Sequence, residues 1–419
     1  MRALASLTQV GAASLDGVDP TIVGQSDWRG LLFAACAQNA SLGRDDERRR
    51  LGVRAVRDRL LLRRTLTPLD RSKTERIAPD ALVRDLVSDL APHAGTSTIR
   101  LAGHGSSGKT TALDLLATRL ATQYDARVTV LTFHHALRGD IRHVFESMPE
   151  AQGLLGEKIH VETATSFLLA VVAAAGGTVP LTADGSIDYD RTDATFREVA
   201  DSLGPHTAAS DGVAVVEEDR ARFDWDHVLI DEAQDWTDAE RYLLIAVYGS
   251  RRMVLADGLV QLIRRHTSCD WMRGVAKTER VVRHLGDSLR MQHNVAVYAN
   301  AIARTLGFAN WSVEPRRDLI GGRVVVLEGE LDDAPTLVRA FGAIAALGKA
   351  DPVDNLICVP HSEIVRTPDG ARDAKLAAEL LANGDRVWDA CDPMTRMSVP
   401  AHVNAWHIVQ YDSCRGLEG

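Results

Sequence analysis

The sequence predicts an α/β protein with two consecutive parallel-sheet lobes, preceded by a mostly helical N-terminal segment. Apolar runs alternate with helical stretches from residue 98 onward, which is typical of parallel strands joined by crossover helices. The runs are almost continuously apolar, as in strands that are covered on both faces. A second series of this kind begins near residue 279, and 419 residues exceed the usual size of one domain.

We therefore expect a helical segment over residues 1–75, a first lobe over 76–275 and a second lobe over 276–419 that is incomplete at its C-terminus. An insertion at about 176–224, rich in Gly, Asp and Thr, interrupts the first lobe. Expected strands of the first lobe are 99–102, 128–132, 159–162, 227–230 and 252–255. Expected strands of the second lobe are 280–283, 323–327, 355–359, 386–388 and 406–409. Expected helices are 109–124, 189–203, 291–306, 335–347 and 371–381.

The composition is that of a globular protein, with 45% hydrophobic and 25% charged residues. No run approaches the roughly 18 uncharged apolar residues of a membrane span, and the start resembles no secretion signal. The five scattered cysteines are Cys36, Cys269, Cys358, Cys391 and Cys414. They form no CxxC pair, which indicates a cytoplasmic location and argues against a zinc site or a disulfide framework.

Charge is distributed unevenly along the chain. The net charge is −9, yet residues 44–76 hold 12 Lys or Arg against 6 Asp or Glu. This stretch is either the solvated face of a helix or a contact surface for phosphates or an acidic partner. The spacing of its apolar residues favours the solvated helix.

A glycine-rich stretch, Gly103-His-Gly105-Ser106-Ser107-Gly108-Lys109-Thr110, matches the Walker A pattern GxxxxGK[ST]. It lies between an apolar run and a helical stretch, so its backbone N–H groups and the helix N-terminus can surround phosphate oxygens. We expect Lys109 to reach the β- and γ-phosphates and the Thr110 hydroxyl to bind Mg²⁺. The predicted nucleotide-binding residues are Gly103, Gly105, Ser106, Ser107, Gly108, Lys109, Thr110 and Thr111.

A second stretch, Val228-Leu-Ile-Asp231-Glu232-Ala-Gln-Asp235, is an apolar run that ends in two adjacent carboxylates. This arrangement is that of a Walker B strand. We expect Asp231 to hold Mg²⁺ and Glu232 to orient and deprotonate the attacking water. The two stretches together predict Mg²⁺-dependent hydrolysis of a nucleoside triphosphate, with ATP as the expected cofactor.

The order of further motifs resembles that of superfamily 1A helicases of the UvrD/Rep type, from about residue 98 to the end. DEAQD at 231–235 is similar to motif II of this branch. Stretches 130–137, 163–167, 254–263, 285–291 and 411–418 resemble motifs Ia, Ib, III, IV and V, in the same order. The resemblance implies two RecA-like lobes with a nucleotide between them and single-stranded DNA, or RNA, bound across both.

The resemblance also implies residue roles. Gln261 would sense the γ-phosphate, Arg290 would act as an arginine finger, and Glu418 would approach the ribose or link the lobes. Contacts with the nucleic-acid strand would come from Phe133, His134, Thr165 and Phe167. The alternatives are an ordinary loop amide at Gln261, a surface ion pair at Arg290, and core or capping roles for the four strand-contact residues.

Several positions depart from the family pattern. No Gln lies between Ala40 and Gly103, and Leu289 stands where the family has the tyrosine that stacks on the base. The choice between ATP and GTP is therefore open. Ala136 replaces a lysine, and the aromatic residues after Gln261 are missing. The sequence ends inside motif V, so we expect a piece of a longer chain whose hydrolysis by itself is weak.

These observations predict a cytoplasmic, ATP- and Mg²⁺-dependent helicase or translocase core, with an effector or partner protein as a further expectation and no membrane association. Two alternatives remain at this point. One is an NTP-driven regulatory switch without strand movement, and the other is a nucleotide-stabilised scaffold that only recruits a partner. A small-molecule kinase is disfavoured, because DEAQD and a second lobe would have no purpose in it.

Overall fold

The computed structural model describes 14 stretches, all inside one compact unit that spans residues 64–419. They are 81–151, 153–183, 185, 187–204, 220–258, 267–286, 288, 291–308, 311–314, 320–326, 334–348, 351–367, 371–396 and 404–414. The expected helical segment at 1–75 and the basic stretch at 44–76 lie outside these residues. So do Cys36, Gln261, Leu289, Arg290 and Glu418.

The first lobe is built on a six-stranded sheet in the order β3-β2-β4-β5-β1-β6, and every neighbouring pair is parallel. The bounds are β1 Thr98–Gly103, β2 Val128–Thr132, β3 Ile159–Thr163, β4 His227–Ile230, β5 Met253–Asp257 and β6 Arg280–Leu285. All five strands expected for this lobe form, within one or two residues of their expected ends. The α/β class is thereby confirmed.

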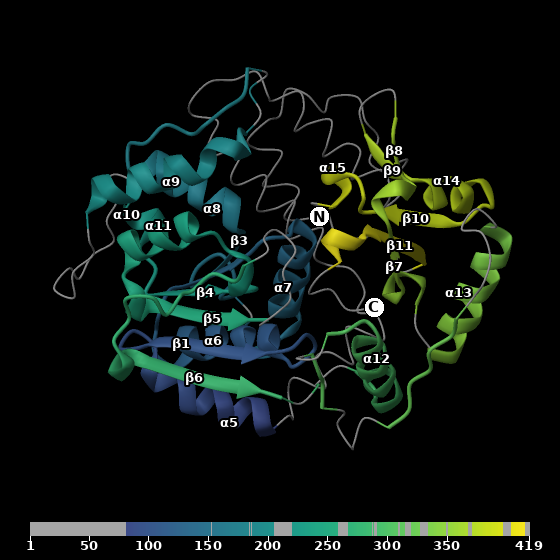
Figure 1. Cartoon of the computed structure of the whole chain (residues 1–419), viewed down its shortest axis with the longest axis horizontal. Coiled ribbons are helices and arrows are strands. Elements are labelled where there is room, and N and C mark those ends of the chain that lie inside the picture. Colours follow the sequence, from purple (N-terminus) through teal and green to yellow (C-terminus); the bar gives the residue numbers. More distant parts are fainter. Residues whose placement is uncertain are drawn as a thin grey trace, which may run out of the picture. The chain divides into compact units, whose positions relative to one another are not determined.

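Helices cover both faces of this sheet, as Figure 1 shows. Successive strand residues point to opposite faces: Leu229 of β4 packs with one core, and its neighbours Val228 and Ile230 pack with the other. One core contains α8 Ala164–Ala174, α9 Tyr189–Leu203 and α11 Asp238–Tyr248. The other contains α5 Ala81–Leu90, α6 Lys109–Gln123 and α7 His135–Ser147. The burial of both faces explains why these strands are apolar throughout.

Strand β6 belongs to the first sheet, which corrects the expectation that residues 280–283 open the second series. It pairs with β1 from Thr98↔Arg280 to Gly103↔Leu285. The first sheet therefore runs to Leu285, beyond the expected lobe boundary at 275. Periodicity identifies a strand but does not say which sheet an edge strand joins, because that choice depends on contacts distant in sequence.

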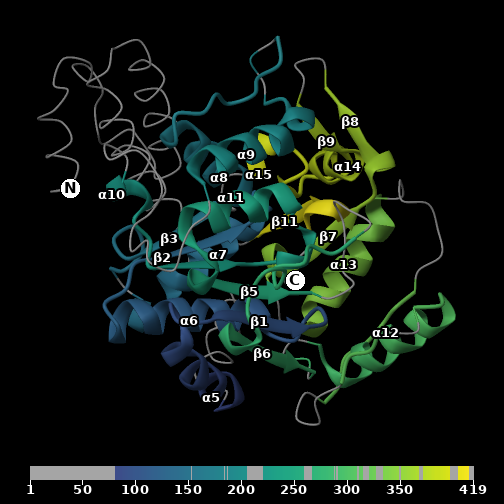
Figure 2. The ribbon, with the colours of Figure 1, turned by 60° about the vertical axis from the view of Figure 1, so that its left-hand side comes forward.

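The second lobe holds a three-stranded parallel sheet in the order β10-β11-β7. Its strands are β7 Leu356–Val359, β10 Arg386–Asp389 and β11 Ala405–Gln410, and a short antiparallel hairpin is formed by β8 Ile364–Arg366 and β9 Arg372–Ala374. The helices of this region are α12 His293–Thr305, α13 Ala334–Gly348, α14 Lys375–Ala382 and α15 Pro393–Arg396. Figure 2 shows α13 and α14 beside this sheet, and both contribute to its core.

Two expectations for the second lobe need correction. The strand expected at 323–327 is not formed over residues 321–326, which have no regular structure and whose Val325 and Val326 are exposed. An apolar run without a strand to pair with remains irregular. The β8–β9 hairpin was not expected, because its three-residue strands are too short to show alternation. The helix expected at 371–381 begins at Lys375, since residues 372–374 form β9.

Candidate nucleotide-binding site

The glycine-rich stretch forms the turn between β1 and α6, as the sequence predicts. A Cβ atom on Gly103 would lie 2.6 Å from both the Leu285 carbonyl oxygen and the Ser107 Oγ, so only glycine fits there. Gly108 takes a φ of +82° as the N-cap of α6, and Ser106 takes a φ of +68°. These left-handed positions curl the backbone into a concave loop in front of a helix N-terminus, which is the form that binds phosphate.

Lys109 lies inside this loop, with 6% of its surface exposed. Its Nζ donates to the carbonyl oxygens of Gly103 at 3.0 Å and His104 at 2.8 Å. Burial and the Lys109 charge also lower the pKa of His104. The ammonium group therefore lies against the loop backbone, where phosphate oxygens of a ligand would be in reach.

The predicted magnesium ligands meet directly. Thr110 Oγ1 donates a hydrogen bond of 3.0 Å to Asp231 Oδ2. Thr110 opens α6, and Asp231 follows β4 at the carboxyl edge of the sheet. The two strands that lead to these residues are separated by β5. Because all strands are parallel, both segments leave the sheet at the same edge, where open α/β sheets bind their ligands.

Asp231 is almost completely buried, and its surroundings raise its pKa to about 6. Burial is the largest cause, and the charge of Glu232 adds to it. Lys109 and the hydrogen bonds from Thr110 and from the Glu232 N–H act in the opposite direction. The carboxylate is therefore ionised near neutral pH but protonated in mild acid, so that a cation would compete with a proton at this position.

Glu232 is held in a left-handed backbone conformation, with φ 53° and ψ 42°. Its N–H donates to Asp231 Oδ1 at 2.9 Å. Its Oε2 accepts a bond of 2.8 Å from Gln234 Nε2, while Gln234 Oε1 accepts one of 2.5 Å from the N–H of Gly258. Gln234 thus bridges the glutamate to the end of β5. The motif contains Gln234, but only the fold reveals this bridge.

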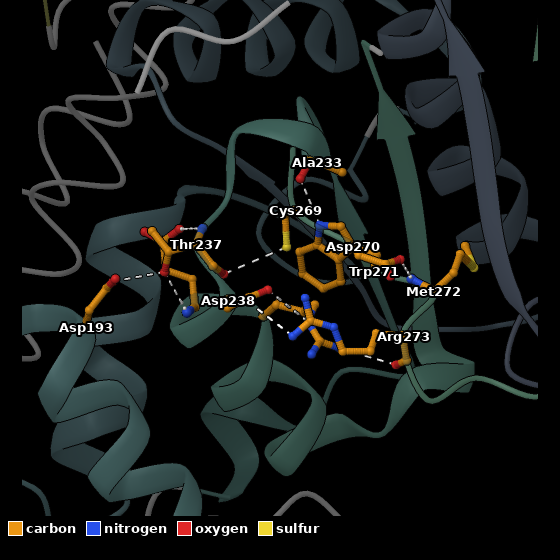
Figure 3. A network of polar contacts seen from close by, with 11 residues as sticks. Asp193, Ala233, Thr237, Asp238, Cys269, Asp270, Trp271, Met272 and Arg273 are labelled. Carbon is orange, nitrogen blue, oxygen red and sulfur yellow. Dashed lines mark hydrogen bonds and ion pairs between the residues drawn. The ribbon is translucent and has the colours of Figure 1, made fainter. Parts of the chain in front are cut away.

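A polar network fixes the turn that follows Glu232 (Figure 3). Trp271 Nε1 donates to the Ala233 carbonyl at 2.8 Å, and the Cys269 N–H donates to the Gln234 carbonyl at 3.0 Å. Thr237 then caps α11 in a capping box with Glu240. These contacts connect the acidic turn to the segment that follows β5 and its expected motif III, a connection that sequence spacing does not show.

The expected insertion also reaches this turn. Its helix α9 places Asp193 Oδ1 2.9 Å from Thr237 Oγ1 (Figure 3). Tyr242 of α11 donates to Asp201 of α9 at 2.9 Å. Helix α9 therefore packs on α11, which begins just after the acidic stretch, rather than lying apart from the lobe.

Asp114 is a further buried carboxyl group near the site that sequence reasoning missed. It lies on the inner face of α6, and its Oδ1 has no hydrogen-bond partner. Burial raises its pKa well above the usual value for aspartate, and the charges of Asp231 and Asp140 raise it further. Asp114 therefore holds its proton more tightly than an ordinary aspartate does. An Asp on the apolar side of a helix is the signal that could have identified it.

The residues expected to contact a nucleic acid differ in their accessibility. Phe133 follows β2 and is half-buried against Trp236, with ring centroids 5.2 Å apart. His134 and Thr165 are also half-buried, after β2 and at the start of α8. Phe167 is a core residue, which corrects the expectation that it contacts a nucleic acid.

The ring of Phe167 is 4% exposed and packs against Phe223 in an edge contact and against Tyr248 in a stacked one. A base cannot stack on this ring, because the side chain is buried in the core. A phenylalanine at this place in the stretch 163–167 suits an apolar helix position equally well, which is why the sequence did not separate the two roles.

Among the described residues, no group of three or more His, Cys, Asp or Glu side chains is arranged to hold a metal ion. Mg²⁺ bound with a nucleotide usually takes only one or two protein ligands, with phosphate oxygens and waters completing its octahedron. Thr110 and Asp231 fit that pattern. None of the described helices has both the length and the apolar character of a bilayer span.

Comparison with known proteins yields no family. No protein-family model and no curated protein matches the chain. One similar solved structure is the SWI2/SNF2 ATPase core of Sulfolobus solfataricus in complex with dsDNA. The match has 10% sequence identity and a TM-score of 0.27, and covers 84% of this chain and 78% of the other.

Proposed function

We propose that the chain is a Mg²⁺-dependent nucleoside triphosphate hydrolase whose site is formed by the loop 103–110 together with Asp231 and Glu232. The observation that carries the proposal is the hydrogen bond between Thr110 Oγ1 and Asp231 Oδ2, beside the buried Lys109. Two segments 121 residues apart in sequence meet with the side chains that the chemistry requires.

Each residue has a defined task in this proposal. The loop N–H groups and Lys109 bind the phosphate oxygens and stabilise the charge that develops in the transition state. Thr110 and Asp231 hold the metal, which when bound neutralises phosphate charge. Glu232 orients the attacking water and accepts its proton. Gln234 positions Glu232, because its amide nitrogen donates to the Glu232 carboxylate while its amide oxygen accepts from the Gly258 N–H.

At the finer level we propose a helicase-like motor core of the UvrD type that acts on single-stranded DNA, or on RNA. The support is the placement of the helicase-like stretches. Those after β2, after β3 and at the end of β5 leave the sheet at the same edge as the phosphate loop. A second parallel sheet follows in the chain, as a two-lobed motor needs. In the proposed motor core, Gln261, Arg290 and Glu418 complete the site.

The alternative is an NTP-driven switch or a nucleotide-stabilised scaffold without strand movement. The buried position of Phe167 favours it, because one expected base contact is removed. The net charge of −9 favours it also, since nucleic-acid affinity depends largely on cationic contacts with phosphates. The two classes differ in whether a nucleic acid accelerates hydrolysis.

The test is ATP and GTP hydrolysis measured with and without single-stranded DNA or RNA. The variants are Lys109→Ala and the control Lys158→Ala, which removes a surface lysine paired with Asp125. We expect Lys109→Ala to lose roughly 10²–10³-fold in rate, the usual cost of one transition-state donor. We expect Lys158→Ala to match the wild type.

Stimulation by a nucleic acid in the wild type supports the motor. Hydrolysis that depends on Lys109 but is equal with and without nucleic acid supports the switch. Nucleotide binding without hydrolysis, unchanged by Glu232→Gln, supports the scaffold. Equal hydrolysis in wild type and Lys109→Ala contradicts the proposed site itself.

A further inference from the structure

Three thiols gather at one end of the second sheet. Cys358 is the third residue of β7, Cys391 stands two residues after β10, and Cys414 stands four residues after β11. Because the three strands are parallel, these positions share the carboxyl edge of the sheet. All three cysteines are free thiols, and neither the nucleotide site nor the expected motifs give any of them a role.

Cys358 and Cys414 lie within hydrogen-bonding reach of each other. Strand β7 lies beside β11, with Cys358 opposite Val409. After β11 the chain makes the short 3-10 turn Tyr411–Ser413, closed by a bond of 3.3 Å from the Cys414 N–H to the Tyr411 carbonyl. This turn brings Cys414 back toward β7, so that the Cys358 thiol can donate to the Cys414 sulfur. The Cys414 thiol itself donates to the Tyr411 carbonyl oxygen at 3.0 Å.

The contact makes the two sulfurs chemically unequal. The hydrogen bond from Cys358 stabilises the Cys414 thiolate and lowers the pKa of Cys414 to about 7. The same bond, together with burial, raises the pKa of Cys358. Cys414 is only partly buried, so that a small oxidant can reach it. A partly exposed thiolate beside a second thiol is the arrangement found at oxidation-sensitive cysteine sites.

We propose that Cys358 and Cys414 form a reversible disulfide when the protein meets a hydroperoxide. The Cys414 thiolate attacks one peroxide oxygen, the O–O bond breaks, and Cys414 becomes a sulfenic acid. The other peroxide oxygen leaves and takes up a proton, giving water or an alcohol. The Cys358 sulfur then attacks the sulfenic sulfur, the S–S bond forms, and water leaves with the Cys358 proton. Two thiols are oxidised and one peroxide is reduced.

Cys391 is the internal comparison for this pair. Its side chain is fully buried, and burial and the neighbouring Asp389 raise its pKa, which suppresses the thiolate. Metal binding is a poor alternative, since no metal-holding group of three side chains occurs among the described residues. Cys358 and Cys414 are therefore the pair that can react among the three thiols.

The test uses the full chain, treated with hydrogen peroxide in small molar excess and then mapped by peptide mass spectrometry without reduction. We expect a peptide that joins Cys358 to Cys414 and disappears with dithiothreitol. The matched control Cys391→Ser is expected to form it unchanged. Cys358→Ser is expected to accumulate a Cys414 sulfenic acid that dimedone traps, and Cys414→Ser to leave Cys358 unmodified.

A second measurement protects the test against a variant that fails to fold. The melting temperature of the oxidised wild type is expected to rise and to return with dithiothreitol, because a cross-link restricts the unfolded chain. Cys391→Ser should show the same rise. A disulfide that includes Cys391, a disulfide only between two molecules, or oxidation without any disulfide overturns the proposal.

Discussion

Glu232 has a backbone conformation that residues other than glycine seldom adopt. Such a conformation costs about 1–3 kcal/mol and persists only where surrounding contacts enforce it. Here the enforcing contacts are the bond to Asp231 Oδ1 and the Gln234 bridge to Gly258. This conformation therefore gives the two adjacent carboxylates different partners, so that Glu232 accepts from Gln234 and Asp231 accepts from Thr110.

The raised pKa of Asp231 predicts the acid limit of hydrolysis. Below about pH 6 the carboxyl group is protonated and cannot bind a cation, so that the rate should fall as the pH drops through this value. The measurement is a pH–rate profile at saturating nucleotide. Because Mg²⁺ and the proton compete for Asp231, a higher Mg²⁺ concentration should move the midpoint to lower pH. A midpoint that does not respond to Mg²⁺ would contradict this assignment.

Asp114 predicts a pH-dependent cost to stability. Its pKa is raised in the folded state, so the folded chain holds this proton more tightly than the unfolded chain does. The free energy of unfolding therefore decreases as the pH rises above the ordinary aspartate pKa, near 4. Asp114→Asn removes the ionisation and should be more stable than the wild type at pH 7, with little difference near pH 3.

The measurement is urea unfolding of both chains across that pH range. The control is Asp125→Asn, at an exposed position that forms an ion pair with Lys158. Its stability difference from the wild type should remain small, since exposed ion pairs contribute about 0–1 kcal/mol. A gap between Asp114→Asn and the wild type that is the same at pH 3 and pH 7 would contradict the assignment.

At the scale of elements, the acidic turn depends on two other segments. The segment 269–273 bonds to the carbonyl groups of Ala233 and Gln234, and α9 contacts the cap of α11. Helix α9 of the insertion expected at 176–224 thus supports the acidic turn. This role follows from packing and leaves no local sequence signal.

Thr237 tests that support. Thr237→Ala removes the capping box of α11 and the bond to Asp193 together. We expect a loss of about 1–2 kcal/mol in the free energy of unfolding, accompanied by slower hydrolysis as the turn before the helix loosens. Thr237→Ser keeps the hydroxyl group and should preserve both. Chemical denaturation and steady-state rates of the two variants decide, and an unaffected Thr237→Ala would contradict the bracing role.

At the scale of the whole molecule, the proposed motor requires that both lobes respond to one nucleotide. A nonhydrolysable ATP analogue with Mg²⁺ at 100 times its Kd should stabilise the native state by about 2.7 kcal/mol. Hydrogen exchange should slow at residues 103–110 and 231–235. If the second lobe completes the site, exchange should also slow near the carboxyl ends of β7 and β11. Protection confined to the first lobe would favour the switch, and Lys109→Ala should show neither effect.

The sequence by itself determined the α/β class, the first five strands and the phosphate loop. These features depend on local periodicity, on glycine positions and on the residue types that phosphate chemistry requires, and all of them are legible over a few neighbouring residues. The roles of Gln261, Arg290 and Glu418 remain predictions, because those residues lie outside the described part of the chain.

Only the tertiary structure decided which sheet holds β6, that Phe167 belongs to the core, and that Asp114 lies buried near Asp231. It also decided that Gln234 bridges Glu232 to Gly258, and that Cys358 meets Cys414 among the three thiols at the edge of the second sheet. Each of these facts is a contact or a burial between segments far apart in sequence. Local patterns constrain the backbone of one segment, whereas the environment of a side chain is set by the segments that fold against it.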